Sequence, residues 1–120
     1  MANTIVWADV PVEDLDRAIS FYSAVLGVTI EKTEFPGGGM GVFPHEGEEV
    51  AGCVFLAEGE SPSRGGPMVY FNCNGRLDEA VEKVTANGGE VLQAKHAIGP
   101  HGFRALVLDS EGNRIALHSE

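Results

Sequence analysis

The sequence predicts an α+β domain built from two βαβββ modules in tandem. Three observations support this. A polar, glycine- and proline-containing stretch at 58–66 divides the chain. Each half then shows the same order of patterns: a strand, an amphipathic helix closed by glycine, and three more strands. Finally, the helices match at a fixed offset, since 77 − 15 = 62 for Leu15 and Leu77. Such an offset indicates an internal duplication, with module one at 1–58, a linker at 59–66 and module two at 67–120.

Module one opens with a β-branched strand at 4–10, which Pro11 ends because proline has no backbone N–H to donate. Apolar residues at helical spacing follow. Asp14 is the expected N-cap of this helix and Gly27 its left-handed C-terminal residue. Three further strands are predicted, and their ranges are 28–35, 40–43 and 50–57.

Module two repeats this order with a strand at 68–73 and a helix that starts at Leu77 and is closed by the sequence NGG at 87–89. The glycine-rich sequence IGPHG forms a turn at 98–102. The remaining strands are predicted at 90–94, 103–108 and 114–118.

Composition narrows the classes of function. The 120 residues suit one domain, and their net charge of −10 disfavours nucleic acid and anionic membranes as partners. No apolar run is long enough to span a membrane. Cys53 and Cys73 lie in apolar runs without CxxC spacing, and no signal peptide is evident. We therefore expect a cytoplasmic protein with two buried free thiols.

Three segments resemble the vicinal-oxygen-chelate superfamily of glyoxalases, bleomycin-resistance proteins and extradiol dioxygenases. They are VPVEDLDRAISFYSAVLGV at 10–28, GRLDEAVEKVTANGGEV at 75–91 and LDSEGNRIALHS at 108–119. The resemblance implies that both modules form one curved mixed sheet around a cavity, where active relatives hold a divalent metal. It also implies a homodimer, in which a cavity can be shared between chains.

The resemblance places the four metal positions at Trp7, at Val54 or Cys53, at Val69 or Met68, and at Ala116. Only a cysteine in this set can bind a divalent metal, whereas a stable site needs about three or four ligands. We therefore expect no metal and no other cofactor. The alternative is a metal-dependent lyase, isomerase or dioxygenase with displaced ligands, drawn from Cys53, His96, His101 and His118.

Strand alternation predicts which side chains reach the cavity. His118 shares a face with Ala116, and Tyr70 and Asn72 are expected to point away from the cavity, opposite Val69. The loop at 95–103 can cover the cavity mouth, and Arg104 can either hold a carboxylate or point to solvent. The predicted ligand contacts are Trp7, Cys53, Val69, His101, Phe103, Arg104, Ala116 and His118.

These observations predict a metal-free protein that binds a small molecule by aromatic stacking and apolar burial, with a mild preference for cations. Whether it is an enzyme stays open. A metal-free enzyme with His118 as general base is one alternative. A purely structural dimer with a filled cavity is another.

Overall fold

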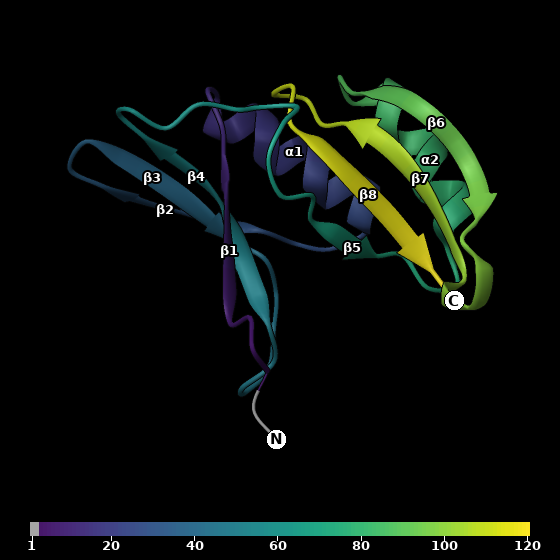
Figure 1. Cartoon of the computed structure of the whole chain (residues 1–120). Coiled ribbons are helices and arrows are strands. Elements are labelled where there is room, and N and C mark those ends of the chain that lie inside the picture. Colours follow the sequence, from purple (N-terminus) through teal and green to yellow (C-terminus); the bar gives the residue numbers. More distant parts are fainter. Residues whose placement is uncertain (1–2) are drawn as a thin grey trace.

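The computed structural model describes residues 3–120 and contains two modules of four strands and one helix each (Figure 1). Module one comprises β1 (Trp7–Pro11), α1 (Leu15–Leu26), β2 (Glu31–Phe35), β3 (Gly38–Val42) and β4 (Ala51–Ala57). Module two comprises β5 (Tyr70–Asn72), α2 (Leu77–Ala86), β6 (Glu90–Ala97), the 3₁₀ turn η1 (Gly99–His101), β7 (Phe103–Leu108) and β8 (Arg114–Ser119). The predicted α+β architecture of two modules is confirmed.

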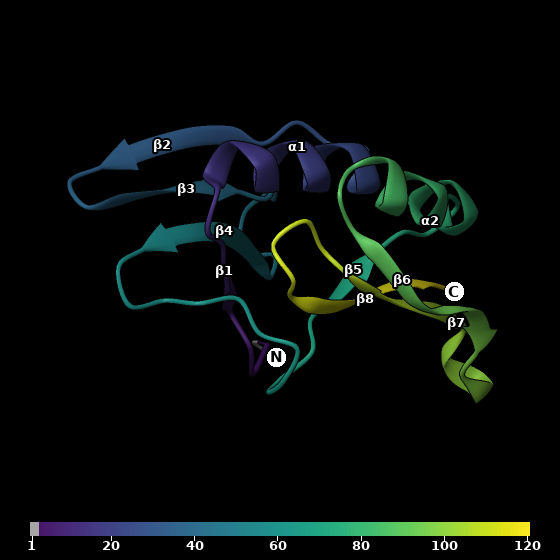
Figure 2. The same ribbon diagram turned by 90° about the horizontal axis from the view of Figure 1, so that it is seen from above.

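The strands form two four-stranded sheets, in the orders β1-β4-β3-β2 and β5-β8-β7-β6. In each sheet the first pair is parallel and the other pairs are antiparallel. The expected single curved sheet is therefore not formed within one chain. The reason is that β1 and β5 are edge strands, each paired on one side only, and they lie apart (Figure 1). The two helices lie next to each other where the modules meet (Figure 2).

Several strand bounds differ from the prediction: β1 begins at Trp7 rather than at residue 4 and includes Pro11, and β5 covers only Tyr70–Asn72 of the predicted range 68–73. The segment 28–30 does not join β2, because the Val28 amide still donates to Ser23 O of α1 and Ile30 packs into the core. Conversely, β6 continues to Ala97, with register shifts against β7. Within residues 3–120, neither helix is long and apolar enough to cross a membrane.

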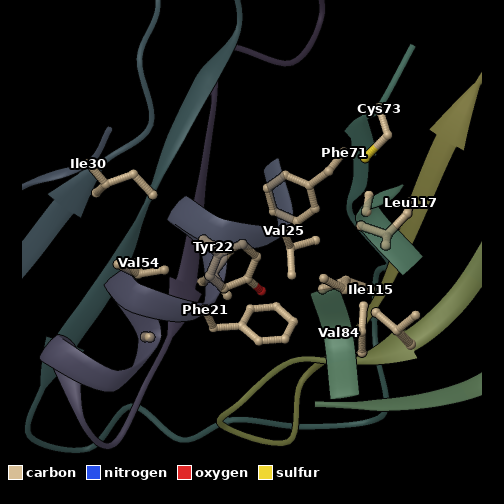
Figure 3. Packing of buried hydrophobic residues seen from close by; sticks show 14 of the residues in the cluster. Phe21, Tyr22, Val25, Ile30, Val54, Phe71, Cys73, Val84, Ile115 and Leu117 are labelled. Atoms are coloured by element: carbon tan, nitrogen blue, oxygen red, sulfur yellow. The ribbon is translucent and has the colours of Figure 1, made fainter. Parts of the chain in front are cut away.

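Helix α1 has the predicted ends. The Asp14 side chain accepts a hydrogen bond from the Arg17 amide at 3.0 Å, and Gly27 adopts φ +66° with its N–H bonded to Ser23 O. The side chains of Phe21 and Tyr22 are fully buried between the modules (Figure 3). Both predicted caps are confirmed, and the apolar stripe of the helix belongs to a core common to the two halves.

Aromatic rings fill the centre of this core. The Tyr22 ring lies 5.4 Å from that of Phe43 and 5.2 Å from that of Phe71, and the latter two rings are also 5.2 Å apart. Such pairs contribute roughly 0.5–1.5 kcal/mol each beyond their area burial. Because Phe71 belongs to module two and the other two rings to module one, the cluster joins the modules.

The turn between β7 and β8 is tied to module one by hydrogen bonds. Buried Asp109 accepts from the Tyr22 hydroxyl at 2.5 Å and from the Glu111 and Asn113 amides at 2.8 and 2.9 Å. Asn113 Nδ2 donates to Pro11 O at 2.7 Å. Burial, and then the Asp109 carboxylate, raise the pKa of Tyr22 well above its ordinary value, so the hydroxyl remains a donor.

Side chains of module two also reach both ends of α1. Glu111 Oε1 accepts from the Glu13 and Asp14 amides at 2.9 and 2.8 Å, and Arg17 Nε donates to Glu111 Oε2 at 2.7 Å. At the other end, Arg76 donates to Val25 O at 2.5 Å. A carboxylate at the N-terminus and a guanidinium at the C-terminus both suit the helix dipole.

The Glu111 contacts predict a pH-dependent stability. Burial alone would raise the pKa of Glu111, but the hydrogen bonds from Arg17 and the two amides outweigh it, so the pKa lies below 4.5. The ionised group therefore stabilises the fold fully above about pH 4.5, and this contribution is lost as the pH falls through the lowered pKa. We expect Glu111→Gln to cost about 1–2 kcal/mol near neutral pH and less in acid.

Urea unfolding over a series of pH values measures this difference. Glu82→Gln is the matched control, because Glu82 is exposed on α2. If both variants parallel the wild-type profile at every pH, Glu111 does not carry the acid-sensitive contribution.

Candidate functional site

Each sheet has a helix face, which packs against the helices, and an open face on the opposite side. Val10 and Val54 belong to the core, so their neighbours Asp9 and Cys53, which pair in register, point to the open face of module one. By the same alternation, the core residue Leu117 sets its neighbour His118 on the open face of module two.

Three side chains meet on the open face of module one. Asp9 Oδ1 accepts hydrogen bonds from Trp7 Nε1 at 2.9 Å and from Cys53 Sγ at 3.3 Å. Burial, followed by the Asp9 carboxylate, raises the pKa of Cys53 to about 11. The thiol is therefore protonated near neutral pH and is a weak nucleophile and a weak metal ligand. We call Trp7, Asp9 and Cys53 the Asp9 cluster.

The residues at the family's metal positions do not fit a metal ion. Of the two alternatives for the second position, Cys53 lies on the open face and Val54 in the core. At the first position, the only polar group of the Trp7 side chain is its indole N–H. This group donates hydrogen bonds and cannot bind a metal ion. Across residues 3–120, no three His, Cys, Asp or Glu side chains are gathered as a metal centre.

The prediction that Tyr70 and Asn72 point away from the site is wrong. Tyr70 pairs with Ala116 and Asn72 with His118, whereas Phe71 and Val69 pack in or against the core. The cause is one additional residue between strand and helix in module two, since 15 − 10 = 5 for Val10 and Leu15 but 77 − 71 = 6 for Phe71 and Leu77. The offset of 62 thus fails for the strand, and Met68 replaces Val69 as the counterpart of Trp7.

Four side chains gather on the open face of module two. Arg104 Nε donates to His96 Nε2 at 3.1 Å, and Arg104 NH1 donates to the Tyr70 hydroxyl. The Arg104 guanidinium lies 5.9 Å from the centroid of the Tyr70 ring, and the Tyr70 and His118 ring centroids are 6.2 Å apart. We call Tyr70, His96, Arg104 and His118 the Arg104 cluster.

Of the predicted contact residues, Trp7 and Cys53 thus belong to one cluster and Arg104 and His118 to the other. His101 reaches the second cluster only through its carbonyl, which lies 2.7 Å from His118 Nε2. Phe103 lies at the start of β7, under the ammonium group of Lys95. Of the remaining two, Val69 packs against the core, and Ala116 is fully buried.

Asp9 and Tyr70 are not among the ligand contacts predicted from the sequence, and His96 is named there only as a possible displaced metal ligand. Asp9 follows Trp7 by two residues in a predicted strand, so the two side chains share a face and the role of Asp9 could have been found from the sequence. The face of Tyr70 could be predicted only by noticing the additional residue between the strand and the helix of module two. His96 lies in a stretch predicted as a loop, where no alternation could be applied.

An apolar groove separates the edge strands β1 and β5. Its volume is about 910 Å³, and its lining includes Trp7, Val50 and Met68 as well as Tyr70 and Phe71. The two clusters therefore lie on different sheets, with this groove between their edge strands.

Comparison with known proteins places this arrangement in a family. The sequence profile of the Glyoxalase/Bleomycin resistance protein/Dioxygenase superfamily matches residues 4–117. The chain belongs to this superfamily. CFP32 of Mycobacterium bovis, provisionally named a glyoxylase, is 28% identical over an alignment of 116 residues that covers 92% of this chain and 43% of that protein. The chain thus spans less than half the length of CFP32. A glyoxylase-like domain-containing protein of Didymella fabae is 29% identical, over 91% of this chain and 88% of its own.

A solved structure shares this fold. A glyoxalase I mutant from Zea mays superposes with a TM-score of 0.74 and 21% identity, over 93% of this chain and 44% of the maize chain. At that identity, the likeness shows the fold of the superfamily alone.

Proposed function

We propose that this glyoxalase- and bleomycin-resistance-like protein binds an organic small molecule without a metal ion. The observation that carries the proposal is the chemistry of the positions where relatives bind metal: Trp7, Cys53, Met68 and Ala116 provide one protonated thiol and no other ligand. The open faces instead carry hydrogen-bonding groups beside aromatic rings, namely Asp9 with Trp7 and Arg104 with Tyr70. Such a combination of apolar surface and a few fixed polar groups is typical of ligand sites.

We further propose that the binding form is a homodimer. The edge strands β1 and β5 each have one unpaired side, as do the outer strands β2 and β6, and an exposed unpaired edge favours pairing with another chain. Large apolar side chains are exposed beside them: Ile5, Val6, Trp7, Val50 and Tyr70. If β1 of one chain pairs with β5 of its partner, a two-fold axis repeats the contact. The Asp9 cluster of one chain then faces the Arg104 cluster of the other.

Metal analysis tests the first proposal. Untagged protein, purified without chelator and then offered Mn, Fe, Ni and Zn, is expected to retain less than about a tenth of an equivalent per chain. Near-stoichiometric retention would overturn the metal-free proposal.

Light scattering tests the proposed homodimer and is expected to give twice the chain mass on the same preparation. Val6→Lys, which places a charge at the edge, is expected to lower that mass to one chain.

A further inference from the structure

We propose that the Arg104 cluster binds the carboxylate of a ligand whose remaining body is apolar. This inference rests on the proposed small-molecule function and names the chemical class of the ligand. It follows from two rows of side chains on the open face of module two. One row is polar on all four strands, and the other is apolar on β5, β8 and β7 and ends at Gln93 on β6.

The polar row crosses all four strands of the sheet. Register pairs Asn72 with His118, His118 with Arg104, and Arg104 with His96. Side chains paired in register lie on one face, so these four groups form a continuous line. Arginine is the only permanently charged group in that line.

Arg104 is held in place without being neutralised. His96 Nδ1 lies 2.8 Å from the backbone carbonyl oxygen of Ala94. Because a carbonyl oxygen can only accept a hydrogen bond, Nδ1 carries the ring hydrogen. His96 Nε2 is then a neutral acceptor for Arg104 Nε. The other partner, the Tyr70 hydroxyl, is also neutral. Among residues 3–120, the salt bridges involve other basic side chains, and none of them includes Arg104.

The guanidinium retains an edge suited to a carboxylate. The hydrogen bonds within residues 3–120 use Nε and one N–H of NH1, which leaves NH2 for a ligand. The Tyr70 hydroxyl accepts from Arg104, so its own proton is available to a second carboxylate oxygen. A planar carboxylate accepts two such bonds at once, and a partly buried guanidinium favours this geometry over a point charge.

The neighbouring row selects an apolar body. Tyr70 pairs with Ala116, and Ala116 pairs with Leu106, directly beside the polar row. Ala116 lies between these two residues and has only a methyl side chain. The Tyr70 ring and the Leu106 side chain therefore form the surface that a bound acid would cover. A carboxylate on Arg104 therefore places its organic body on this row. A single fixed cation also matches one negative charge better than the two charges of a phosphate monoester.

Titration with phenylacetate, phenylacetamide and inorganic phosphate tests the inference. We expect phenylacetate to shift the ¹⁵N resonance of Arg104 Nε and to bind at least tenfold more tightly than the amide or phosphate. Arg104→Gln is expected to weaken phenylacetate binding at least tenfold. Arg104→Lys keeps the charge but not the planar fork, so it restores little of the affinity. Arg64→Gln is the control, because it removes an equal charge from an exposed arginine paired with Glu90.

The outcomes separate this inference from the proposed function. If the acid and the amide bind equally, or if Arg104→Gln binds the acid like the wild type, the carboxylate anchor is wrong although a small-molecule site exists. If none of the probes perturbs the open face up to its solubility limit, the anchor is wrong as well. A protein that retains stoichiometric metal overturns the metal-free function, whatever the probes do.

Discussion

Replacing Asp109 with alanine is expected to destabilise the protein by about 3–5 kcal/mol, because several buried donors lose their acceptor at once. The Asp109 carboxylate accepts from the Tyr22 hydroxyl, from the amides of Glu111 and Asn113, and from Asn113 Nδ2. Its removal leaves several buried donors without their acceptor, and each such donor costs about 1–3 kcal/mol before relaxation. Equilibrium unfolding in urea, followed by circular dichroism, measures the loss.

Tyr22→Phe serves as the matched control. It removes one of the donors and keeps the ring in the aromatic core, so the expected cost is about 1–2 kcal/mol. The role assigned to Asp109 is wrong if Asp109→Ala costs no more than Tyr22→Phe. If Asp109→Ala does not fold, Asp109→Asn, which keeps one acceptor oxygen, provides the comparison.

Replacing Gly52 with alanine is expected to cost about 3 kcal/mol, at the upper end for added volume in a packed interior. A Cβ at this position would lie 2.4 Å from Ala8 O, on the neighbouring strand β1. A backbone carbonyl cannot rotate away as a side chain can, so β1 and β4 must separate. Because β1 carries Trp7, the only tryptophan, its fluorescence emission is expected to shift along with the unfolding midpoint.

Gly65→Ala is the control for Gly52→Ala. A Cβ there has Ser63 Oγ at 3.6 Å as its nearest contact, and Gly65 has no positive φ. We expect it to change stability by less than about 0.5 kcal/mol. Equal effects of the two substitutions would show that the close approach at Ala8 is relieved without separating the strands.

The elements set by local chemistry could be predicted from the sequence. The Asp14 N-cap, Gly27 and the apolar stripe between them define α1 without any tertiary information, and β7 was predicted to the residue. Features that depend on counting across modules were less accessible. One additional residue before Leu77 reversed the predicted face of β5, because a shift of one position in a strand moves every side chain to the other face.

The candidate site was predictable only in part. The sequence suggested that Arg104 could bind a carboxylate, but it did not indicate the partners of Arg104. Tyr70 comes from β5, whose face was predicted wrongly, and His96 comes from a part of β6 that was predicted as a loop. Likewise, the split into two sheets depends on how the modules pack through their helices, and strand patterns do not report this.

Both ends of α1 are completed by residues that come much later in the chain. Arg76 binds Val25 O at one end, and Glu111 binds the Glu13 and Asp14 amides at the other. During synthesis on the ribosome, the first helix therefore emerges long before its last partner does. We expect the nascent first half to remain loosely structured until the turn between β7 and β8 has emerged, so that the two modules complete their folds together rather than one after the other.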